Sequence, residues 1–284
     1  MKGRDFLADM AARSRERVAA AIPRESEAAL QARALAMPAP PPLRLASFDV
    51  IAELKMRSPA AGELQAASFD KRQQIEAYAR GGACAVSVLT EPEEFNGTLA
   101  DLEEAAALLQ PFGIPAMRKD FLTAPYQLLE ARAAGAGGAL VIVTMLDDAT
   151  VAELLSCALE LDLFVLLEGF DTDDLSRIAA LAEGADPQRV LAGVNCRNLS
   201  NLQVDFRRFA ELSAALPGAM RTVAESGVGS AEDIRSVAGD GYSLALVGSA
   251  LMSSDSPAQN LAAYIEAGRS ATARRNTANG RSTA

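Results

Sequence analysis

Short apolar segments alternate with longer segments of helical periodicity through most of this chain. The apolar segments are rich in Val, Ile, Leu and Ala, which favours buried strands. They recur every ~20 to 35 residues, the spacing expected when each strand is followed by a crossover helix. The pattern predicts eight strands: Val50 to Lys55, Ala83 to Thr90, Pro115 to Asp120, Ala139 to Met145, Phe164 to Glu168, Val190 to Asn195, Arg221 to Glu225 and Leu244 to Val247.

Eight strand and helix pairs fit an α/β fold of the (β/α)8 type, a TIM barrel of about 250 residues. An open doubly wound sheet also alternates strands and helices, but the sequence after the first strand is MRSPAAG rather than GxGxxG. Residues 1–46 are predicted to form a helical extension that ends in the proline-rich linker MPAPPPLRLA. The barrel is expected over residues 47–267. The tail 268–284 has no apolar periodicity and is predicted to be disordered.

Charged residues stand at the ends of several of these apolar strands. Glu53 and Lys55 are two residues apart, so a strand places both on the same face. Four further polar residues end later strands: Lys119, Glu168, Asn195 and Glu225. Each one alone could be an ordinary residue facing solvent where a strand meets a loop. Because barrel active sites form at the carboxyl ends of strands, we expect these side chains to meet there and shift one another's pKa values toward neutrality.

Composition narrows the chemistry further. The chain of 284 residues has a formal net charge of -10, so nucleic acid would be repelled and any phosphate site must be local. It has no histidine, which removes His-based triads and nearly all catalytic zinc sites. Its three cysteines suggest neither a disulfide framework nor a metal site, which favours a reducing cytoplasm. Apolar runs are too short for a membrane span, and no feature indicates an oligomeric state.

Lysine is scarce, because Lys2, Lys55, Lys71 and Lys119 are the only four in the chain. An ammonium group can lose its proton when desolvated, whereas a guanidinium effectively cannot. A lysine retained at a strand end is therefore a candidate acid or base.

Two glycine-containing turns indicate a phosphate site. Ser226 and Gly227 follow the seventh predicted strand, and Gly248 and Ser249 follow the eighth. Loops at these two positions often bind phosphate in barrels, because glycine lets backbone N–H groups approach an anion. The alternative is that both are ordinary helix-entry turns.

Apolar residues near the same strand ends suggest a pocket for an aromatic group. Phe95 follows the second strand, Phe121 follows the third and Leu199 follows the sixth. Each could equally be core or loop packing. Together they would form a flat apolar wall beside the charged centre.

The chain resembles the indole-3-glycerol phosphate synthase family of tryptophan biosynthesis. The resemblance extends from the N-terminal helix to about residue 267. It rests on seven motifs in the family's order and spacing: IAELKMRSPAAG, VLTEPEEFNGTL, MRKDFLTAPYQLLEARAAGA, LLEGF, GVNCRNL, VAESGV and LVGSALM.

The resemblance implies conversion of 1-(2-carboxyphenylamino)-1-deoxyribulose 5-phosphate to indole-3-glycerol phosphate, with loss of carbon dioxide and water and without metal or organic cofactor. By motif position, Lys119 is the general acid and Lys55 holds an anionic part of the substrate and assists dehydration. Glu53 is a base or orienting group, and Glu168 pairs with a lysine. Asn195 and Glu225 orient substrate hydroxyls and the anilino nitrogen.

The resemblance also implies a set of binding residues. The phosphate would lie on the two turns already described, and Pro59, Phe95, Phe121 and Leu199 would line the anthranilate pocket. Ser58 and Arg197 complete the expected substrate-binding set. The chain departs from the family at Ala60, where a serine is usual, at Gly169-Phe170 after Glu168, and at Cys196 after Asn195.

Two other functions stay open from the sequence. One is a different phosphosugar barrel enzyme such as a phosphoribosylanthranilate isomerase, although those enzymes use a Cys and Asp pair and this chain has Glu53 and Lys55 at the first strand. The other is a barrel that binds a phosphorylated ligand without turnover.

Overall fold

The structure, a computed structural model, describes residues 6–58, 62–63, 69–197 and 203–281. Eight parallel strands close into a barrel in the order β1-β10-β9-β8-β7-β6-β5-β4, with β1 paired to both β10 and β4. The strands are β1 (Asp49–Leu54), β4 (Ala85–Leu89), β5 (Ala116–Lys119), β6 (Gly138–Ile142), β7 (Phe164–Gly169), β8 (Val190–Asn195), β9 (Arg221–Glu225) and β10 (Leu244–Val247). The predicted TIM barrel is confirmed.

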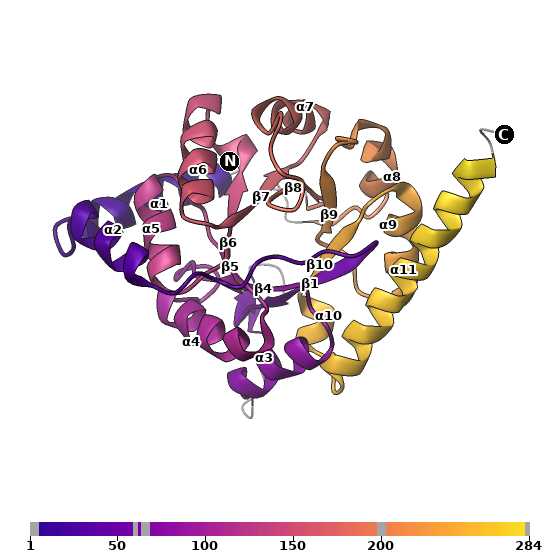
Figure 1. Cartoon of the computed structure of the whole chain (residues 1–284), viewed down its shortest axis with the longest axis horizontal. Coiled ribbons are helices and arrows are strands. Elements are labelled where there is room, and N and C mark those ends of the chain that lie inside the picture. The colour runs from indigo at the N-terminus through magenta and orange to yellow at the C-terminus, as the bar shows by residue number, and fades with distance from the viewer. Residues whose placement is uncertain (1–5, 59–61, 64–68, 198–202, 282–284) are drawn as a thin grey trace.

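Helices surround the barrel, and two of them precede it (Figure 1). Those two are α1 (Phe6–Ala21) and α2 (Glu27–Ala36). The others are α3 (Lys71–Arg80), α4 (Leu99–Leu109), α5 (Pro125–Ala133), α6 (Asp148–Glu160), α7 (Thr172–Leu181), α8 (Arg208–Leu212), α9 (Ala231–Asp240), α10 (Ser249–Met252) and α11 (Pro257–Arg281). Short 3-10 turns are η1 (Gln110–Phe112), η2 (Val143–Met145) and η3 (Ser213–Ala215).

Local sequence explains where the outer helices begin. Asp70, Thr98, Asp147, Asp171 and Ser230 each cap a helix by accepting a hydrogen bond from a backbone N–H of its first turn. These caps end the loops that follow five of the barrel strands, so they also define the rim on which a site can form.

The core has two layers that follow the period-2 pattern of the strands. Side chains such as Ile51, Leu166 and Val223 fill the barrel interior, while Ala52 and Leu167 pack against the helices. Residues two positions further along the same interior face reach the carboxyl end of the barrel, and that is where the polar residues of the sequence lie.

Most predicted strand ends lie within two residues of the observed ones, but the structure differs in one longer stretch and adds one pair of strands. The fourth strand was expected to reach Met145, but β6 ends at Ile142 and η2 follows. Arg177 of α7 donates hydrogen bonds to the carbonyls of Val143 and Leu146. These two carbonyls therefore bind a side chain instead of a neighbouring strand. A two-stranded hairpin, β2 (Arg57–Ser58) with β3 (Gly62–Glu63), also lies in the loop after β1 and was not predicted.

The tail predicted to be disordered from residue 268 is instead part of α11, which continues to Arg281 along α9 (Figure 1). Gly268 lies against the Phe48 ring, and Arg269 donates hydrogen bonds to Phe48 and Asp49. Arg275 donates to the carbonyl of Ala238. This segment is held by hydrogen bonds from arginine side chains and by the close approach of a glycine to an aromatic ring. Neither kind of contact requires apolar residues at a helical spacing, so the sequence pattern did not indicate a helix here.

Candidate active site

Four charged side chains from four different strands converge at the carboxyl end of the barrel. Lys119 of β5 lies at the centre, with its Nζ 2.9 Å from Glu225 Oε2, 3.6 Å from Glu168 Oε2 and 3.7 Å from Glu53 Oε2. All four side chains are at most 15% exposed. The alternative that each of these residues simply faces solvent at the end of its strand is wrong, because the barrel brings the four side chains together and shields them from solvent.

A second lysine adds to this cluster. Lys55 Nζ lies 2.8 Å from Glu53 Oε1, so Glu53 contacts both lysines through its two oxygens. Gly248, directly after the adjacent strand β10, makes room for this pair, since a Cβ there would lie 2.5 Å from Glu53 Oε1 and 2.9 Å from Lys55 Nζ. The glycine of this turn therefore has a steric role beside the ion pair.

Asn195 and Gly193 of β8 complete the charged rim. Asn195 donates from Nδ2 to Glu168 Oε1 at 3.2 Å, and its Oδ1 accepts a hydrogen bond from the Arg197 backbone. Gly193 leaves room for the Glu225 carboxylate, since a Cβ at this position would be 2.2 Å from Glu225 Oε1. Glu225 is fully buried behind Lys119.

The cluster perturbs three pKa values in different directions. Burial raises the pKa of Glu225 to about 8; Lys119 opposes this shift and Glu168 adds to it. For Lys119, burial favours the neutral amine, but the three carboxylates outweigh burial and raise its pKa. For Glu53, burial is opposed by Lys55 and Lys119, which lower the pKa below its ordinary value. The expected shift toward neutrality therefore applies to Glu225 and is wrong for Lys119 and Glu53.

These pKa shifts give Lys119, Glu53 and Glu225 different abilities to donate or accept a proton. Lys119 is a protonated ammonium near neutral pH, held where it can donate a proton. Glu53 is ionised and can accept one. Glu225 titrates near neutral pH, so it can exchange a proton with its neighbours.

The charged rim opens into a cavity of about 420 Å³. Lining residues come from the barrel strands, the loops after them and the start of α1. The predicted site residues that line it are Glu53, Lys55, Phe95, Lys119, Phe121, Glu168, Asn195, Arg197, Ser226, Gly227, Gly248 and Ser249. Ser58 ends β2, while Pro59, Ala60 and Leu199 lie outside the described residues.

One side of the cavity is aromatic. The rings of Phe95 and Phe121 lie 6.3 Å apart between centroids, and Phe6 of α1 packs edge-on against Phe121 at 5.8 Å. Leu7 and Phe170 extend this apolar surface. A flat ring could be enclosed here beside the charged rim.

The opposite side combines small residues with two cations. Ser226 and Gly227 adopt positive φ values of 67° and 85°, a left-handed conformation that glycine tolerates and serine rarely adopts. Gly248 is the N-cap of α10, and Ser249 is the first residue of that helix. Lys55 and Arg197 line the same cavity, so an anion held at these turns would also meet positive charge.

Sequence reasoning missed several lining residues. Phe6 and Leu7 belong to a helix that precedes the barrel, and Val204 lies in the loop after β8. The α1 residues carried only an ordinary amphipathic signal, which does not reveal which face of the barrel the helix will cover. Phe170 was noted as a family departure and also lines the cavity.

Within the described part of this rim, neither a metal-binding group nor a reactive thiol is evident. Among the residues that the structure describes, no group of three or more His, Cys, Asp or Glu side chains is arranged to hold a metal ion. Burial raises the pKa of the Cys196 thiol to about 12, so it is protonated at neutral pH. Within the described ranges, no helix is both long and apolar enough to cross a membrane.

Comparison with known sequences gives a consistent result. Residues 7–264 match the family model described as indole-3-glycerol phosphate synthase. An indole-3-glycerol phosphate synthase of Parafrankia sp. (strain EAN1pec) is 41% identical over 262 residues, 92% of each chain. One of Mycolicibacterium gilvum (strain PYR-GCK) is 41% identical over 247 residues, which cover 86% of this chain and 87% of the relative.

Solved structures show likeness of fold alone. A 3-hexulose-6-phosphate synthase from Salmonella typhimurium superposes with a TM-score of 0.58 at 14% identity, covering 80% of this chain and 100% of the other. A thiamine phosphate pyrophosphorylase from Pyrococcus furiosus gives 0.55 at 14% identity, covering 79% and 97%.

Proposed function

The chain belongs to the indole-3-glycerol phosphate synthase family of tryptophan biosynthesis, and we propose that the charged rim around Lys119 performs this family's ring closure. The family's enzymes are carboxy-lyases. The substrate is 1-(2-carboxyphenylamino)-1-deoxyribulose 5-phosphate, and indole-3-glycerol phosphate, carbon dioxide and water are the products.

The position of Lys119 is the observation that supports this proposal most strongly. Its ammonium lies at the cavity, surrounded by three acidic side chains that raise its pKa. Lys119 donates its proton to the substrate's carbonyl oxygen while the ring carbon that bears the carboxylate attacks the carbonyl carbon. The bond to the carboxylate then breaks, carbon dioxide leaves and the electron pair restores the aromatic ring.

Dehydration follows at the same rim. The hydroxyl formed in the first step must leave with a proton from the neighbouring carbon to give water. Lys55 protonates the leaving hydroxyl, and ionised Glu53, 2.8 Å from Lys55, accepts the proton. Asn195 orients the substrate from the end of β8. Glu225 acts through Lys119, because it contacts that ammonium and is fully buried.

The two ends of the cavity match the two ends of the substrate. The aromatic side formed by Phe95, Phe121 and Phe6 receives the anthranilate ring. The turns at Ser226-Gly227 and Gly248-Ser249 receive the phosphate. The reacting carbonyl would then lie between them, over Lys119.

Family membership favours the lyase reaction over a phosphoribosylanthranilate isomerase. The remaining alternative is a barrel that binds the substrate without converting it. Turnover separates these, because only the lyase forms an indole ring, which is detected by its fluorescence.

The test uses purified protein with the carboxyphenylamino substrate. We expect indole fluorescence to rise with the wild type and to stay at background with Lys119→Ala. Lys71→Ala is the matched control, since Lys71 pairs with Asp101 and Glu104 on the outer helices. No product from folded wild-type protein at any substrate concentration would refute the proposed function.

A further inference from the structure

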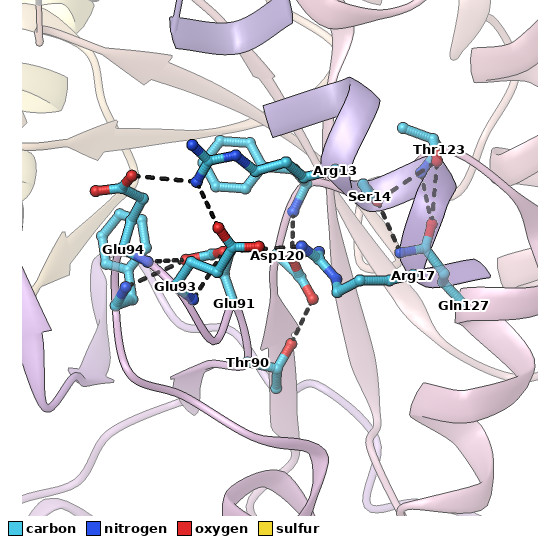
Figure 2. Close-up of polar contacts among 12 residues, drawn as sticks. Arg13, Ser14, Arg17, Thr90, Glu91, Glu93, Glu94, Asp120, Thr123 and Gln127 are labelled. Atoms are coloured by element: carbon cyan, nitrogen blue, oxygen red, sulfur yellow. Dashed lines mark hydrogen bonds and ion pairs between the residues drawn. The ribbon is translucent and has the colours of Figure 1, made fainter. Parts of the chain in front are cut away.

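A polar network joins α1 to the loops that carry the aromatic side of the cavity (Figure 2). Its central acid is Glu91, which follows β4 and is 0% exposed. None of the proposed catalytic steps uses Glu91. A buried carboxylate is costly unless it is hydrogen-bonded and paired, so its contacts indicate what it does.

Glu91 holds the loop that carries Phe95. Its Oε1 accepts a hydrogen bond from the backbone N–H of Glu93 at 3.0 Å, and its Oε2 accepts from Glu94 at 2.7 Å and from Phe95 at 3.2 Å. An ionised carboxylate suits this position because both of its oxygens only accept. The Phe95 backbone is therefore fixed directly by the Glu91 side chain.

Asp120 fixes the backbone of Phe121, the second ring of the aromatic side, in the same way. Its Oδ1 accepts from the backbone N–H of Phe121 at 2.8 Å, and its Oδ2 accepts from Thr90 at 2.9 Å and from Arg118 at 3.2 Å. Each of the two facing phenylalanines is thus held at its own N–H by a buried carboxylate.

Arg17 of α1 connects these two acids (Figure 2). Its Nη2 donates to Asp120 Oδ1 at 2.7 Å, and its Nη1 lies 3.7 Å from Glu91 Oε1. That Nη1 is buried and has no hydrogen-bond partner, so the charge of Glu91 is what compensates it. Among the described residues, Arg17 is the only cation within 4.0 Å of the Glu91 carboxylate.

The same helix contributes a ring of its own. Phe6, at the start of α1, packs edge-on against Phe121, and Leu7 lines the cavity beside it. Arg17 therefore ties together the three segments that carry Phe6, Phe95 and Phe121. Arg13 also joins α1 to this loop, but through Glu93 and Glu94, which are 55% and 29% exposed.

We propose that Arg17 and Glu91 are positioning residues that set the aromatic side of the cavity for the substrate's anthranilate ring. This inference rests on the proposed function. The two residues act on the ring through the backbones of Phe95 and Phe121 and through helix α1. They leave the phosphate turns, on the opposite side of the cavity, unaffected.

The proposal predicts selective loss of affinity for the aromatic half of the substrate. Arg17→Ala and Glu91→Gln should each raise KM for the carboxyphenylamino substrate by about tenfold, the usual scale for coupled groups in one network. The inhibition constant of ribulose 5-phosphate, which has the phosphate but no ring, should stay at the wild-type value. The double variant should be little worse than either single one.

Arg33→Ala is the matched control, because Arg33 forms an exposed ion pair with Glu25 in the same N-terminal segment and contacts neither aromatic loop. We expect wild-type KM from it. Arg17→Lys keeps the charge but cannot reach both carboxylates in the same way, so it should behave like Arg17→Ala. It also serves as the test if Arg17→Ala does not fold.

Three outcomes would overturn the inference: unchanged KM in folded variants, equal losses for substrate and ribulose 5-phosphate, or additive losses in the double variant. A lower melting temperature with unchanged KM would assign the network a purely structural role. Wild-type turnover, measured in parallel, separates this result from failure of the proposed function.

Discussion

Adding one methyl group at Gly193 should disable the charged rim although every proposed catalytic residue keeps its identity. Gly193 lies on β8, and its missing side chain is what admits the Glu225 carboxylate. In Gly193→Ala the new Cβ would be 2.2 Å from Glu225 Oε1 and 3.0 Å from the Leu166 side chain. Contacts under 3.0 Å essentially never occur for real Cβ atoms, so the carboxylate must move.

The required displacement is about 1 Å, which restores an ordinary contact distance. Glu225 Oε2 is 2.9 Å from Lys119 Nζ, so a shift of that size can break this hydrogen bond and leave Lys119 to its two more distant carboxylates. Misplacement of a reacting group by 1 Å costs ~10²-fold in rate. Overpacking of the barrel interior should cost ~1–3 kcal/mol of the free energy of unfolding.

The assay is kcat from indole fluorescence, with the free energy of unfolding measured by denaturant titration. Gly138→Ala is the steric control, because its Cβ would lie 2.3 Å from the Phe164 ring and would not meet Glu225. Both variants should lose stability, but only Gly193→Ala should lose about 10²-fold in kcat. If folded Gly193→Ala turns over at the wild-type rate, the contact between Glu225 and Lys119 has no part in catalysis.

Three further predictions concern the charged rim. Lys119→Arg keeps the positive charge but should lower kcat by about 10²-fold or more, since guanidinium is a poor general acid; near-normal turnover would show that charge alone suffices. Glu53→Gln should reduce kcat more than it raises KM, and steady-state kinetics showing a large KM rise at unchanged kcat would contradict a role in the transition state. For Glu225, the folded-state pKa is raised from 4.5 to about 8, so the native state retains a proton that the unfolded chain has lost. Its contribution to stability is therefore full below pH 4.5 and declines as pH rises toward 8, by at most about 1.4 kcal/mol per pH unit. Denaturant titrations across this window should show that the decline is absent in Glu225→Gln, and an identical pH dependence in both proteins would refute the shift.

The barrel and much of its rim were predictable from local patterns. Alternation along the first strand places Glu53 and Lys55 on one shared face, because side chains in a strand alternate between two faces. The spacing of eight apolar segments favoured a closed parallel barrel, and the carboxyl ends of such strands share one rim. The positions of Lys119, Glu168 and Glu225 at strand ends therefore predicted that they meet there before any distance was known.

Other features depended on contacts between segments far apart in the chain. The tail beyond residue 267 was misjudged because Arg269 and Arg275 hold it through backbone carbonyls and a carboxylate, which leave no periodic signal. Similarly, α1 was predicted as a helix, but its place over the aromatic side of the cavity follows from Arg17 meeting Glu91 and Asp120.

Sequence alone therefore determined which residues are charged, which face of a strand they occupy and which family's motifs they form. Tertiary structure decided that Lys119 lies closest to Glu225, that glycines at 193 and 248 leave room for carboxylates, and that α1 supplies Phe6. The physical reason is that periodicity records only the environment of each residue, buried or exposed. The identity of a partner, and the pKa shifts that it causes, depend on distances of a few ångströms that exist only after the barrel has closed.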